Sequence, residues 1–394
     1  MTLQQQFSII MSGFKKLLQN LTAKKSDDST PAAQAQPPSH RWSGIDNTQP
    51  AGTNPITAFS VEYLGEQRSL NSSHRRDLGF AGHIGGKWYG VYGDTLWSSP
   101  GVTDPDADPD PEGFHGMVRN SVAALTADDP LVVRDCHLNG DEPVAHPGQF
   151  TPWEERWGER IETGFGGTSL VEVDGDEGVG AVYYLINDNE NYRHAGIARV
   201  QLINDAPTVT QRLGEHGWWW DCSTMAKYGD IAAYRDVNSD YIYVWGHPPK
   251  TVTEWPMTEY VYQARVKAKE AFELDKYEYW WGRRKGWRRE VLRGEEHDAE
   301  SAVMWGVGQG QVVFSEWFKC YIYVHLNGPK VALRTADKVE GPWSEDREVY
   351  TAEPIAGGFV YAGVAYPYLD ETGRTLTIAF TNNNHIQVIR VTFE

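Results

Sequence analysis

Short runs of β-forming residues recur along most of the chain and constrain its fold more than any other feature. They combine aromatic and β-branched residues, as in KWYGVYGDTLW at 87–97, GVGAVYYLIND at 178–188, YIYVWG at 241–246 and LTIAFTNNNHIQVIRVTF at 376–393. Turn residues such as Gly, Asn and Asp separate the runs, as expected of strands joined by hairpins. The sequence therefore predicts an all-β fold with few helices.

The spacing of these runs indicates how the strands are grouped. They repeat at irregular intervals of roughly 50 to 70 residues, near the length of a four-stranded propeller blade with long connections. About five such blades fit between residues 55 and 394. A sandwich or a barrel would usually need fewer strands. We therefore predict a five-bladed β-propeller.

The first 55 residues differ from the rest. Apolar residues between Leu3 and Leu21 recur at spacings of three and four, the pattern of one apolar helix face. Residues 26–55 are rich in Ser, Asp, Ala, Gln and Pro, which predicts a disordered linker. We expect an amphipathic helix or tail at 1–25, a disordered linker at 26–55 and the propeller at 56–394.

The N-terminal segment does not have the pattern of a classical signal peptide. Such a peptide places its positive charges before a long unbroken apolar run and ends at a small-residue cleavage site. The chain also has no run of 18 apolar residues, so no membrane-spanning helix is expected. A cytoplasmic location and non-classical secretion both stay open.

The charge of the chain excludes one class of partner. There are 54 acidic residues and 36 basic ones, and the formal net charge is −18. Because nucleic-acid affinity comes mainly from Lys and Arg that neutralise phosphates, we expect no nucleic-acid partner. The acidity favours solubility, and an acidic cleft for a neutral or cationic ligand is the alternative.

Carboxylates occur about once per predicted blade, next to aromatic or apolar strand residues. These are Asp77, Asp94, Asp188, Asp221 and Glu300. An unpaired carboxylate in such surroundings costs free energy, so each is a candidate site residue. In a propeller, residues at the ends of the inner strands converge from distant parts of the sequence. Glycoside hydrolysis needs two carboxyl groups that flank the scissile bond, and this pattern can supply them.

Asp77 and Asp94 form the best candidate catalytic pair. Seventeen positions separate them, and the intervening LGFAGHIGGKWYGVYG predicts a strand, a Gly-Gly turn and a second strand. Such a hairpin can bring both carboxylates to the same end of the propeller. The alternative is that Asp94 caps a turn by accepting hydrogen bonds from nearby backbone N–H groups.

Three further residues are candidates for substrate binding. Trp219, within the run Trp218-Trp219-Trp220, can stack on the C–H face of a sugar ring, although core packing explains at least one of the three tryptophans. Asp221 follows directly, and His247 precedes two prolines. A structural role in a turn is the alternative for both Asp221 and His247.

An ordered set of motifs resembles the uncharacterised-domain family numbered 4185, a group of five-bladed propellers. The motifs are Asp-Leu-Gly at 77–79, Tyr-Gly-Asp-Thr at 92–95, Gly-Gly-Thr-Ser at 166–169, Leu-Arg-Thr-Ala at 333–336 and Gly-Pro-Trp-Ser at 341–344. The likeness covers about residues 57 to 394. Gly-Pro-Trp-Ser alone occurs in many propeller glycosidases, whereas the ordered set is more specific.

The resemblance implies a glycoside hydrolase. That family includes retaining endo-D-arabinanases, whose two catalytic aspartates resemble Asp77 and Asp94 in motif and spacing. It implies that one aspartate is the nucleophile and the other the acid/base, without saying which. The expected partner is a polysaccharide or oligosaccharide, possible substrates include arabinofuranose polymers, and the chain is expected to be a monomer. No cofactor is expected, with a central calcium or sodium ion left open.

Two alternatives remain at this point. One is an inverting hydrolase similar to five-bladed arabinanases and xylosidases, with Asp94 as base, Asp221 as modulator and Glu300 as acid. The other is a propeller that binds glycans without cleaving them. In that case aromatic residues would line the site, and salt bridges, for instance to Arg75, Arg76 or Arg119, would hold Asp77 or Asp94.

Overall fold

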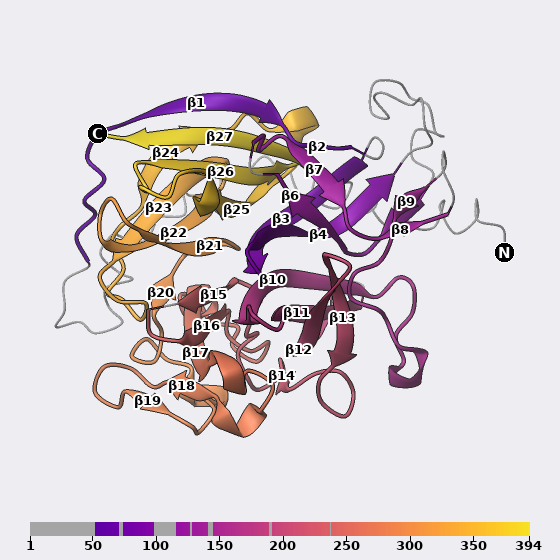
Figure 1. Ribbon diagram of the computed structural model, residues 1–394. Helices are drawn as coiled ribbons and strands as arrows, with labels where there is room; N and C mark the ends of the chain where they lie inside the picture. Colours follow the sequence, from indigo (N-terminus) through magenta and orange to yellow (C-terminus); the bar gives the residue numbers. More distant parts are fainter. Residues whose placement is uncertain are drawn as a thin grey trace, which may run out of the picture. The chain divides into compact units, whose positions relative to one another are not determined.

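The computed structural model describes residues 52–70, 74–97, 116–126, 128–140, 145–188, 191–236 and 238–394. The segment expected at 1–25 and most of the linker expected at 26–55 lie outside these ranges. The described strands form five sheets of four to six strands, which are the blades of a five-bladed β-propeller (Figure 1). The prediction of an all-β five-bladed propeller is confirmed.

Blades 1, 2 and 3 each begin with the innermost strand and add strands outward. Blade 1 consists of β3 (His74–Ile84), β4 (Lys87–Trp97), β6 (Ser121–Leu125), β7 (Val132–Asp135) and β2 (Arg68–Ser69), with β5 (Gly116–Val118) beside β4. Blade 2 consists of β10 (Gly164–Asp174), β11 (Val179–Asp188), β12 (Asn191–Ile203) and β13 (Ala206–Arg212), with β14 (Trp220–Asp221) beside β12. Blade 3 consists of β15 (Ala232–Asp236), β16 (Tyr241–Gly246), β17 (Tyr260–Lys267), β18 (Glu278–Trp280) and β19 (Trp287–Arg288), with β20 (Met304–Trp305) beside β17.

Blades 4 and 5 follow the same order. Blade 4 consists of β21 (Gln311–Ser315), β22 (Cys320–Asn327), β23 (Lys330–Ala336) and β24 (Arg347–Thr351). Blade 5 consists of β25 (Val360–Tyr366), β26 (Thr375–Asn382), β27 (His385–Phe393) and β1 (Phe59–Glu66). A small ribbon joins β8 (Leu138–Asn139) to β9 (His146–Pro147). Short 3-10 turns lie in the connections: η2 (Glu155–Trp157), η3 (Met257–Glu259), η4 (Ala268–Glu270), η5 (Leu274–Lys276), η6 (Gly294–Glu296), η7 (Ile355–Gly357) and η8 (Pro367–Leu369).

The ring closes through a strand from the N-terminal part of the chain. Strand β1 pairs antiparallel with β27, from Phe59 opposite Phe393 to Glu66 opposite Gln387 (Figure 1). Residues just before the boundary expected at 56 also contact the propeller. The Asn54 side-chain amide donates hydrogen bonds to backbone carbonyls of blade 4, at 3.1 and 3.2 Å.

Apolar side chains fill every interface between neighbouring blades. Within the described ranges there are five buried clusters, and each joins two adjacent blades: 1 with 2, 2 with 3, 3 with 4, 4 with 5, and 5 with 1. The second strand of blade 2, VGAVYYLIND in β11, is buried along almost its whole length because both faces of the blade contact a neighbour. Burial of this apolar surface is the main force that holds the ring together.

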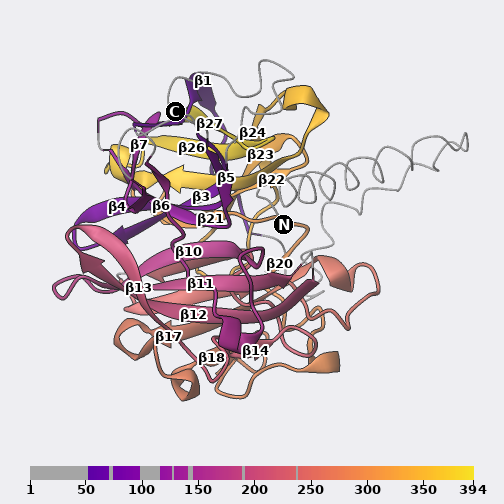
Figure 2. The same ribbon diagram turned by 90° about the vertical axis from the view of Figure 1, so that its right-hand side faces the viewer.

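The five inner strands, β3, β10, β15, β21 and β25, each contact the next around the centre of the ring (Figure 1), and Figure 2 shows β3 and β10 from the side. We call the end of the ring at which these strands begin the leading end, and the opposite end the trailing end. The β3–β4 hairpin turns at the trailing end through Gly85 and Gly86, whose φ angles are 58° and 79°. Glycine suits this two-residue turn because both positions require positive φ.

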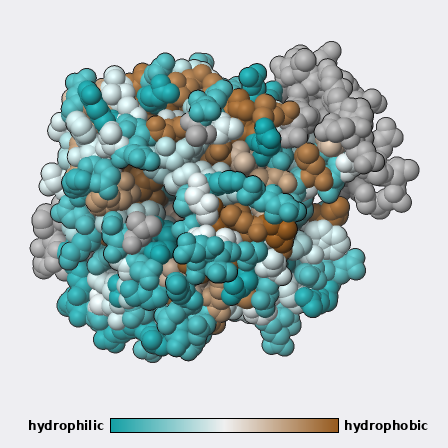
Figure 3. Space-filling model, in the orientation of Figure 1, coloured by the Kyte–Doolittle hydropathy of each residue, from teal (hydrophilic) through white to brown (hydrophobic). Residues whose placement is uncertain are grey.

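The face of the molecule that Figure 3 shows is mainly hydrophilic, with separate hydrophobic patches. Among the described residues, no helix is long and apolar enough to cross a membrane.

We predict that the side chain of Gln311, in blade 4, stabilises the fold by hydrogen-bonding to the backbones of blades 1 and 5. Its side-chain amide donates to the Ala81 carbonyl at 2.9 Å and accepts from the N–H groups of Ala81 and Ala365, both at 3.3 Å. Gln311→Leu would leave these buried backbone groups unpaired and lower the free energy of unfolding by about 3 kcal/mol. Urea denaturation measures this loss. The matched control Gln211→Leu, on an exposed position of β13, should change it by less than about 0.5 kcal/mol, and equal effects of the two substitutions would contradict the prediction.

Candidate active site

The β3–β4 hairpin brings Asp77 and Asp94 together at the leading end. Arg76 lies opposite Thr95, and Leu78 lies opposite Tyr92. Between these two pairs, Asp77 on one strand faces both Gly93 and Asp94 on the other, which makes a β-bulge. The hairpin expected from the sequence is therefore present, and its bulge directs the Asp77 carboxyl toward the backbone beside Asp94.

The Asp77 carboxyl is enclosed by neighbours from two blades. Its Oδ1 atom lies against Gly93, where any side chain would collide with it. The Tyr361 hydroxyl, from β25 of blade 5, donates a 2.6 Å hydrogen bond to Oδ2. Oδ1 is buried beside the N–H groups of Gly93 and Asp94, but no hydrogen bond of normal geometry reaches it from the described residues.

Burial governs the ionisation of Asp77. Loss of solvent, with the negative charge of Asp94 as the second cause, raises the pKa of Asp77 to about 7, and the hydrogen bond from Tyr361 opposes this rise. Burial and the charge of Asp77 also raise the pKa of Tyr361 far above its usual value. Tyr361 therefore stays protonated and remains a donor to Asp77.

Asp94 has a different environment from Asp77. Its side chain is 38% exposed, and the Arg119 guanidinium lies 3.4 Å from both of its oxygens. Burial raises the pKa of Asp94, and the positive charge of Arg119 opposes the rise. Arg76, another arginine close in sequence, forms a buried ion pair with Asp135 at 3.1 Å. Among the described residues, the pair thus contains one carboxyl without a neighbouring arginine, Asp77, and one beside an arginine, Asp94.

Tyr361 and Arg119 were not among the residues that we predicted from the sequence. Tyr361 lies 284 positions from Asp77, and only the closure of blade 5 against blade 1 brings them into contact. Tyr192 of β12 lies close enough to Tyr361 to influence its ionisation. Neither tyrosine belongs to a local motif that marks it. Arg119 was named only as a partner that would hold the aspartates in a salt bridge.

His247 and Asp188 also lie at the leading end, in blades 3 and 2. The His247 Nδ1 atom lies 3.0 Å from the buried carboxylate of Asp230, which also accepts from the His247 N–H at 3.0 Å. A side chain at Gly167 would lie 2.6 Å from the Asp230 backbone, so this glycine allows blades 2 and 3 to approach. Asp188 ends β11 and forms an ion pair with Arg193 at 3.2 Å.

Trp219 and Asp221 have structural contacts. Trp219 packs edge-on against Trp220 and Tyr277, with ring centroids 5.8 and 5.7 Å apart. It lies half-buried against the apolar cluster between blades 2 and 3. Asp221 accepts a 2.9 Å hydrogen bond from the Ser223 N–H. Burial favours its neutral form, but that bond and nearby positive charges hold the pKa of Asp221 below its usual value.

Glu300 lies in the connection between β19 and β20 of blade 3. Its carboxylate forms an ion pair with Arg284 at 2.9 Å, and its N–H donates to Asp298 at 2.9 Å. The contacts described for Glu300 and Asp221 join them to local partners. Neither residue has a described contact with Asp94, and an inverting pair needs none, since its carboxyls lie about 6.5–9.5 Å apart.

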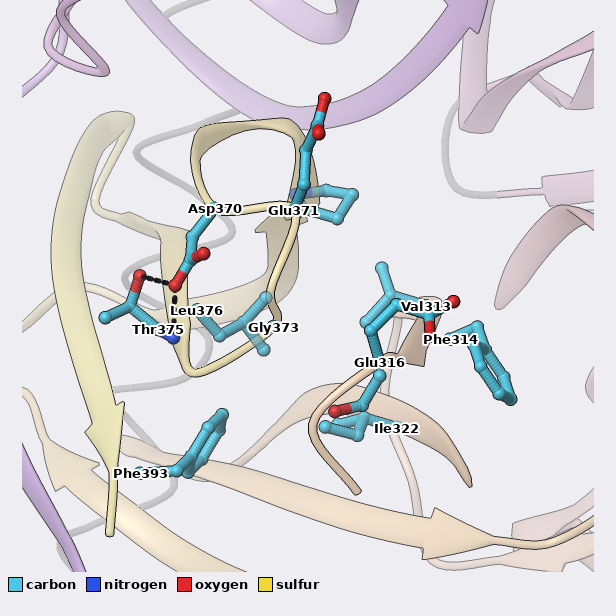
Figure 4. A pocket seen from close by; sticks show the side chains of 12 residues that line it. Val313, Phe314, Glu316, Ile322, Asp370, Glu371, Gly373, Thr375, Leu376 and Phe393 are labelled. Atoms are coloured by element: carbon cyan, nitrogen blue, oxygen red, sulfur yellow. Dashed lines mark hydrogen bonds between the residues drawn. The ribbon is translucent and has the colours of Figure 1, made fainter. Parts of the chain in front are cut away.

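No metal site is evident in the part of the chain that the structure describes, since no group of three or more His, Cys, Asp and Glu residues there could hold an ion. A pocket of ≈ 60 Å³ lies at the trailing end between blades 4 and 5 (Figure 4). Asp370 at its edge accepts hydrogen bonds from Thr372 and Thr375. None of the candidate residues lines this pocket.

Comparisons with known proteins extend the description of the fold. No protein-family model matches the chain, and no curated protein matches it in sequence. A candidate hydrolase from Bacteroides ovatus is 16% identical with a TM-score of 0.53, over 82% of this chain and 87% of that one. This similarity shows a shared fold.

Two other solved structures are more distant. An N-acetylgalactosamine deacetylase from F. plautii is 10% identical, with a TM-score of 0.48 over 86% of this chain and 96% of that one. The GH43_1 enzyme from Xanthomonas citri is 13% identical, with a TM-score of 0.48 over 84% and 90%. At these TM-scores neither structure adds to the argument about this chain.

The environment of the pair predicts how Asp77 titrates. In the wild type its pKa should be about 7. Asp94→Asn should lower it, because a neighbouring negative charge is lost, and Tyr361→Phe should raise it, because the carboxylate loses a hydrogen bond. Carboxyl 13C NMR across pH 4 to 9 measures the three values. An Asp77 pKa near 4 in the wild type, or one unchanged by both substitutions, would contradict the geometry described.

Proposed function

We propose that this chain is a glycoside hydrolase that cleaves a polysaccharide by a retaining mechanism, with Asp77 and Asp94 as the catalytic pair. The observation that carries the proposal is the contrast between the two adjacent carboxyls. Asp77 is enclosed, has no arginine beside it in the part of the chain that the structure describes, and has its pKa raised to about 7, whereas Asp94 lies 3.4 Å from Arg119. Two adjacent carboxyls in different environments can take the acid and nucleophile roles.

The contrast supports one assignment of the two roles. Asp77, whose pKa is raised to about 7, is protonated in about half of the molecules at pH 7 and can donate that proton to the glycosidic oxygen as the bond to the anomeric carbon breaks. Asp94, whose negative charge Arg119 stabilises, attacks that carbon and forms a glycosyl ester. Asp77 then accepts a proton from water, the water oxygen bonds to the anomeric carbon, and Asp94 is released. Asp77 donates one proton and regains one from water, and the attacking electron pairs come first from Asp94 and then from the water oxygen, so the proposed reaction needs no cofactor.

The proposed substrate is an arabinofuranose-containing polysaccharide. Its support is the motif resemblance, in which Asp77 and Asp94 correspond to the aspartates of family 4185 arabinanases. The five-bladed fold agrees with that family, although a fold does not determine a substrate. His247 and Asp188, at the same end of the ring as the pair, are proposed to bind the sugar chain.

A glycan-binding propeller without catalysis is the second candidate. The observation in its favour is the contact between Arg119 and Asp94, since a salt bridge can hold a carboxylate in a structural role. Against it, the 3.4 Å separation is long for a charge-assisted hydrogen bond. Asp77 also accepts a hydrogen bond from a tyrosine and remains buried without an ion pair.

Substitution of either aspartate should abolish cleavage. We expect the wild type to release oligosaccharides from a panel that includes arabinogalactan and plant arabinan, and Asp77→Asn and Asp94→Asn to reduce the rate at least about 100-fold. Mass spectrometry of the released sugars measures this. Asp205→Asn serves as the control and should keep most of the activity, because Asp205 lies in the exposed turn between β12 and β13 at the trailing end. Glycan binding without release by any variant would instead support the second candidate.

Azide should distinguish the two roles. With an activated aryl glycoside, Asp94→Gly plus azide should give a glycosyl azide of inverted configuration, because azide takes the place of the nucleophile. Asp77→Gly plus azide should give a retained product, because the glycosyl ester still forms. NMR of the two azides measures their configuration. The opposite pattern would exchange the roles, and no rescue of either variant would count against a retaining mechanism.

A further inference from the structure

An exposed aromatic residue lies at the leading end, beside the catalytic pair. Phe359 is 60% exposed and follows η7 in the connection between blades 4 and 5. It precedes Tyr361, the residue bonded to Asp77, by two positions. Successive side chains of an extended chain point to opposite sides, so Phe359 and Tyr361 extend to the same side of the chain.

The backbone of Phe359 is held in place. Its carbonyl accepts a 2.9 Å hydrogen bond from the Asn383 N–H, which continues the ladder between β25 and β26. The buried Asn382 side chain accepts from the Ile355 N–H at 2.9 Å and donates to the Glu353 carbonyl at 2.8 Å. The connection that carries Phe359 is therefore fixed at both ends to the β26–β27 turn.

The same turn also holds the strand that carries Asp77. The Asn384 carbonyl accepts a 2.9 Å hydrogen bond from the N–H of Arg76, the residue before Asp77. Phe359 and Arg76, the residue before Asp77, are thus hydrogen-bonded to the same β26–β27 turn. An aromatic side chain has only two χ angles to restrict on binding, which suits it to contact a ligand.

We propose that Phe359 is a substrate-binding residue that stacks on the C–H face of a sugar ring next to the bond that is cleaved. The inference rests on the proposed function, because it assigns Phe359 a place in the same site. Single exposed apolar residues are common on proteins and need no explanation by themselves. Phe359 differs from such residues by its position two residues from Tyr361 and by its hydrogen bond to the turn that also holds the strand of Asp77.

A second exposed aromatic residue provides a matched control. Trp317 is 45% exposed and lies in the turn after β21, at the trailing end. The Arg374 guanidinium lies 5.7 Å from the centroid of its ring. Trp317 is thus similar in kind and exposure to Phe359 but lies at the opposite end of the inner strands.

The experiment compares Phe359→Ala, Phe359→Leu, Phe359→Tyr and Trp317→Ala. Phe359→Ala should raise KM for a polymeric substrate about tenfold with kcat changed less than about threefold, because stacking contributes to binding before and during the reaction. Phe359→Leu should show most of this loss, since it keeps an apolar side chain but no flat ring. Phe359→Tyr should have nearly the KM of the wild type, since it keeps a flat aromatic ring, and Trp317→Ala should leave KM unchanged. Thermal unfolding of each variant checks that the fold is intact.

A binding measurement separates this inference from the proposed function. In the Asp94→Asn background, Phe359→Ala should raise the Kd for the same glycan about tenfold, as measured by calorimetry or affinity electrophoresis. This result would support the inference even if the wild type released no sugar. Unchanged KM and Kd in folded Phe359→Ala would overturn it, as would equal losses in Trp317→Ala. Failure of the whole glycan panel to bind would also overturn it.

Discussion

Closure of the ring is the constraint on which the rest of the structure depends. Each blade has two apolar faces, and both are buried only when every blade has a neighbour on each side. Strand β1 completes blade 5 beside β27, so residues from the two ends of the propeller share one sheet. The cluster between blades 5 and 1 then closes the circle of five interfaces. Because burial of apolar surface dominates folding, an open ring would lose a large part of its stability.

The candidate site lies at this closure. The Leu78 N–H, next to Asp77, donates to the Thr381 hydroxyl of blade 5 at 2.9 Å, and Tyr361 of the same blade reaches Asp77 itself. The enclosure that buries Asp77 and the Tyr361 hydrogen bond that holds its carboxyl in place therefore depend on the last blade docking against the first. Arg119, by contrast, belongs to blade 1 together with Asp94. The side-chain donor that affects the pKa of Asp77 thus comes from the neighbouring blade, whereas the arginine that affects the pKa of Asp94 comes from the same blade.

Local sequence patterns were sufficient for the fold and for the candidate pair. Repeated strand and turn signals predicted the five blades, and the Gly-Gly turn placed Asp77 and Asp94 on one hairpin because they are close in sequence. Tyr361 could not be found in this way, since no local pattern connects it to a residue 284 positions away. The packing of Trp219 against Tyr277 likewise depends on the docking of blades 2 and 3. The turn contact of Asp221 agrees with the alternative that its sequence left open.

The central claim is that Asp94 is the nucleophile that attacks the anomeric carbon, while Asp77 donates and later accepts the proton. The most direct test is to trap the glycosyl-enzyme with a 2-deoxy-2-fluoro arabinofuranoside that carries an activated leaving group, and to locate the label by peptide mass spectrometry. Our account predicts a stoichiometric label on Asp94, in the peptide that contains Tyr92 to Thr95. A label on Asp77 would contradict the assignment of roles. No label in a preparation that hydrolyses the corresponding substrate would contradict the retaining mechanism.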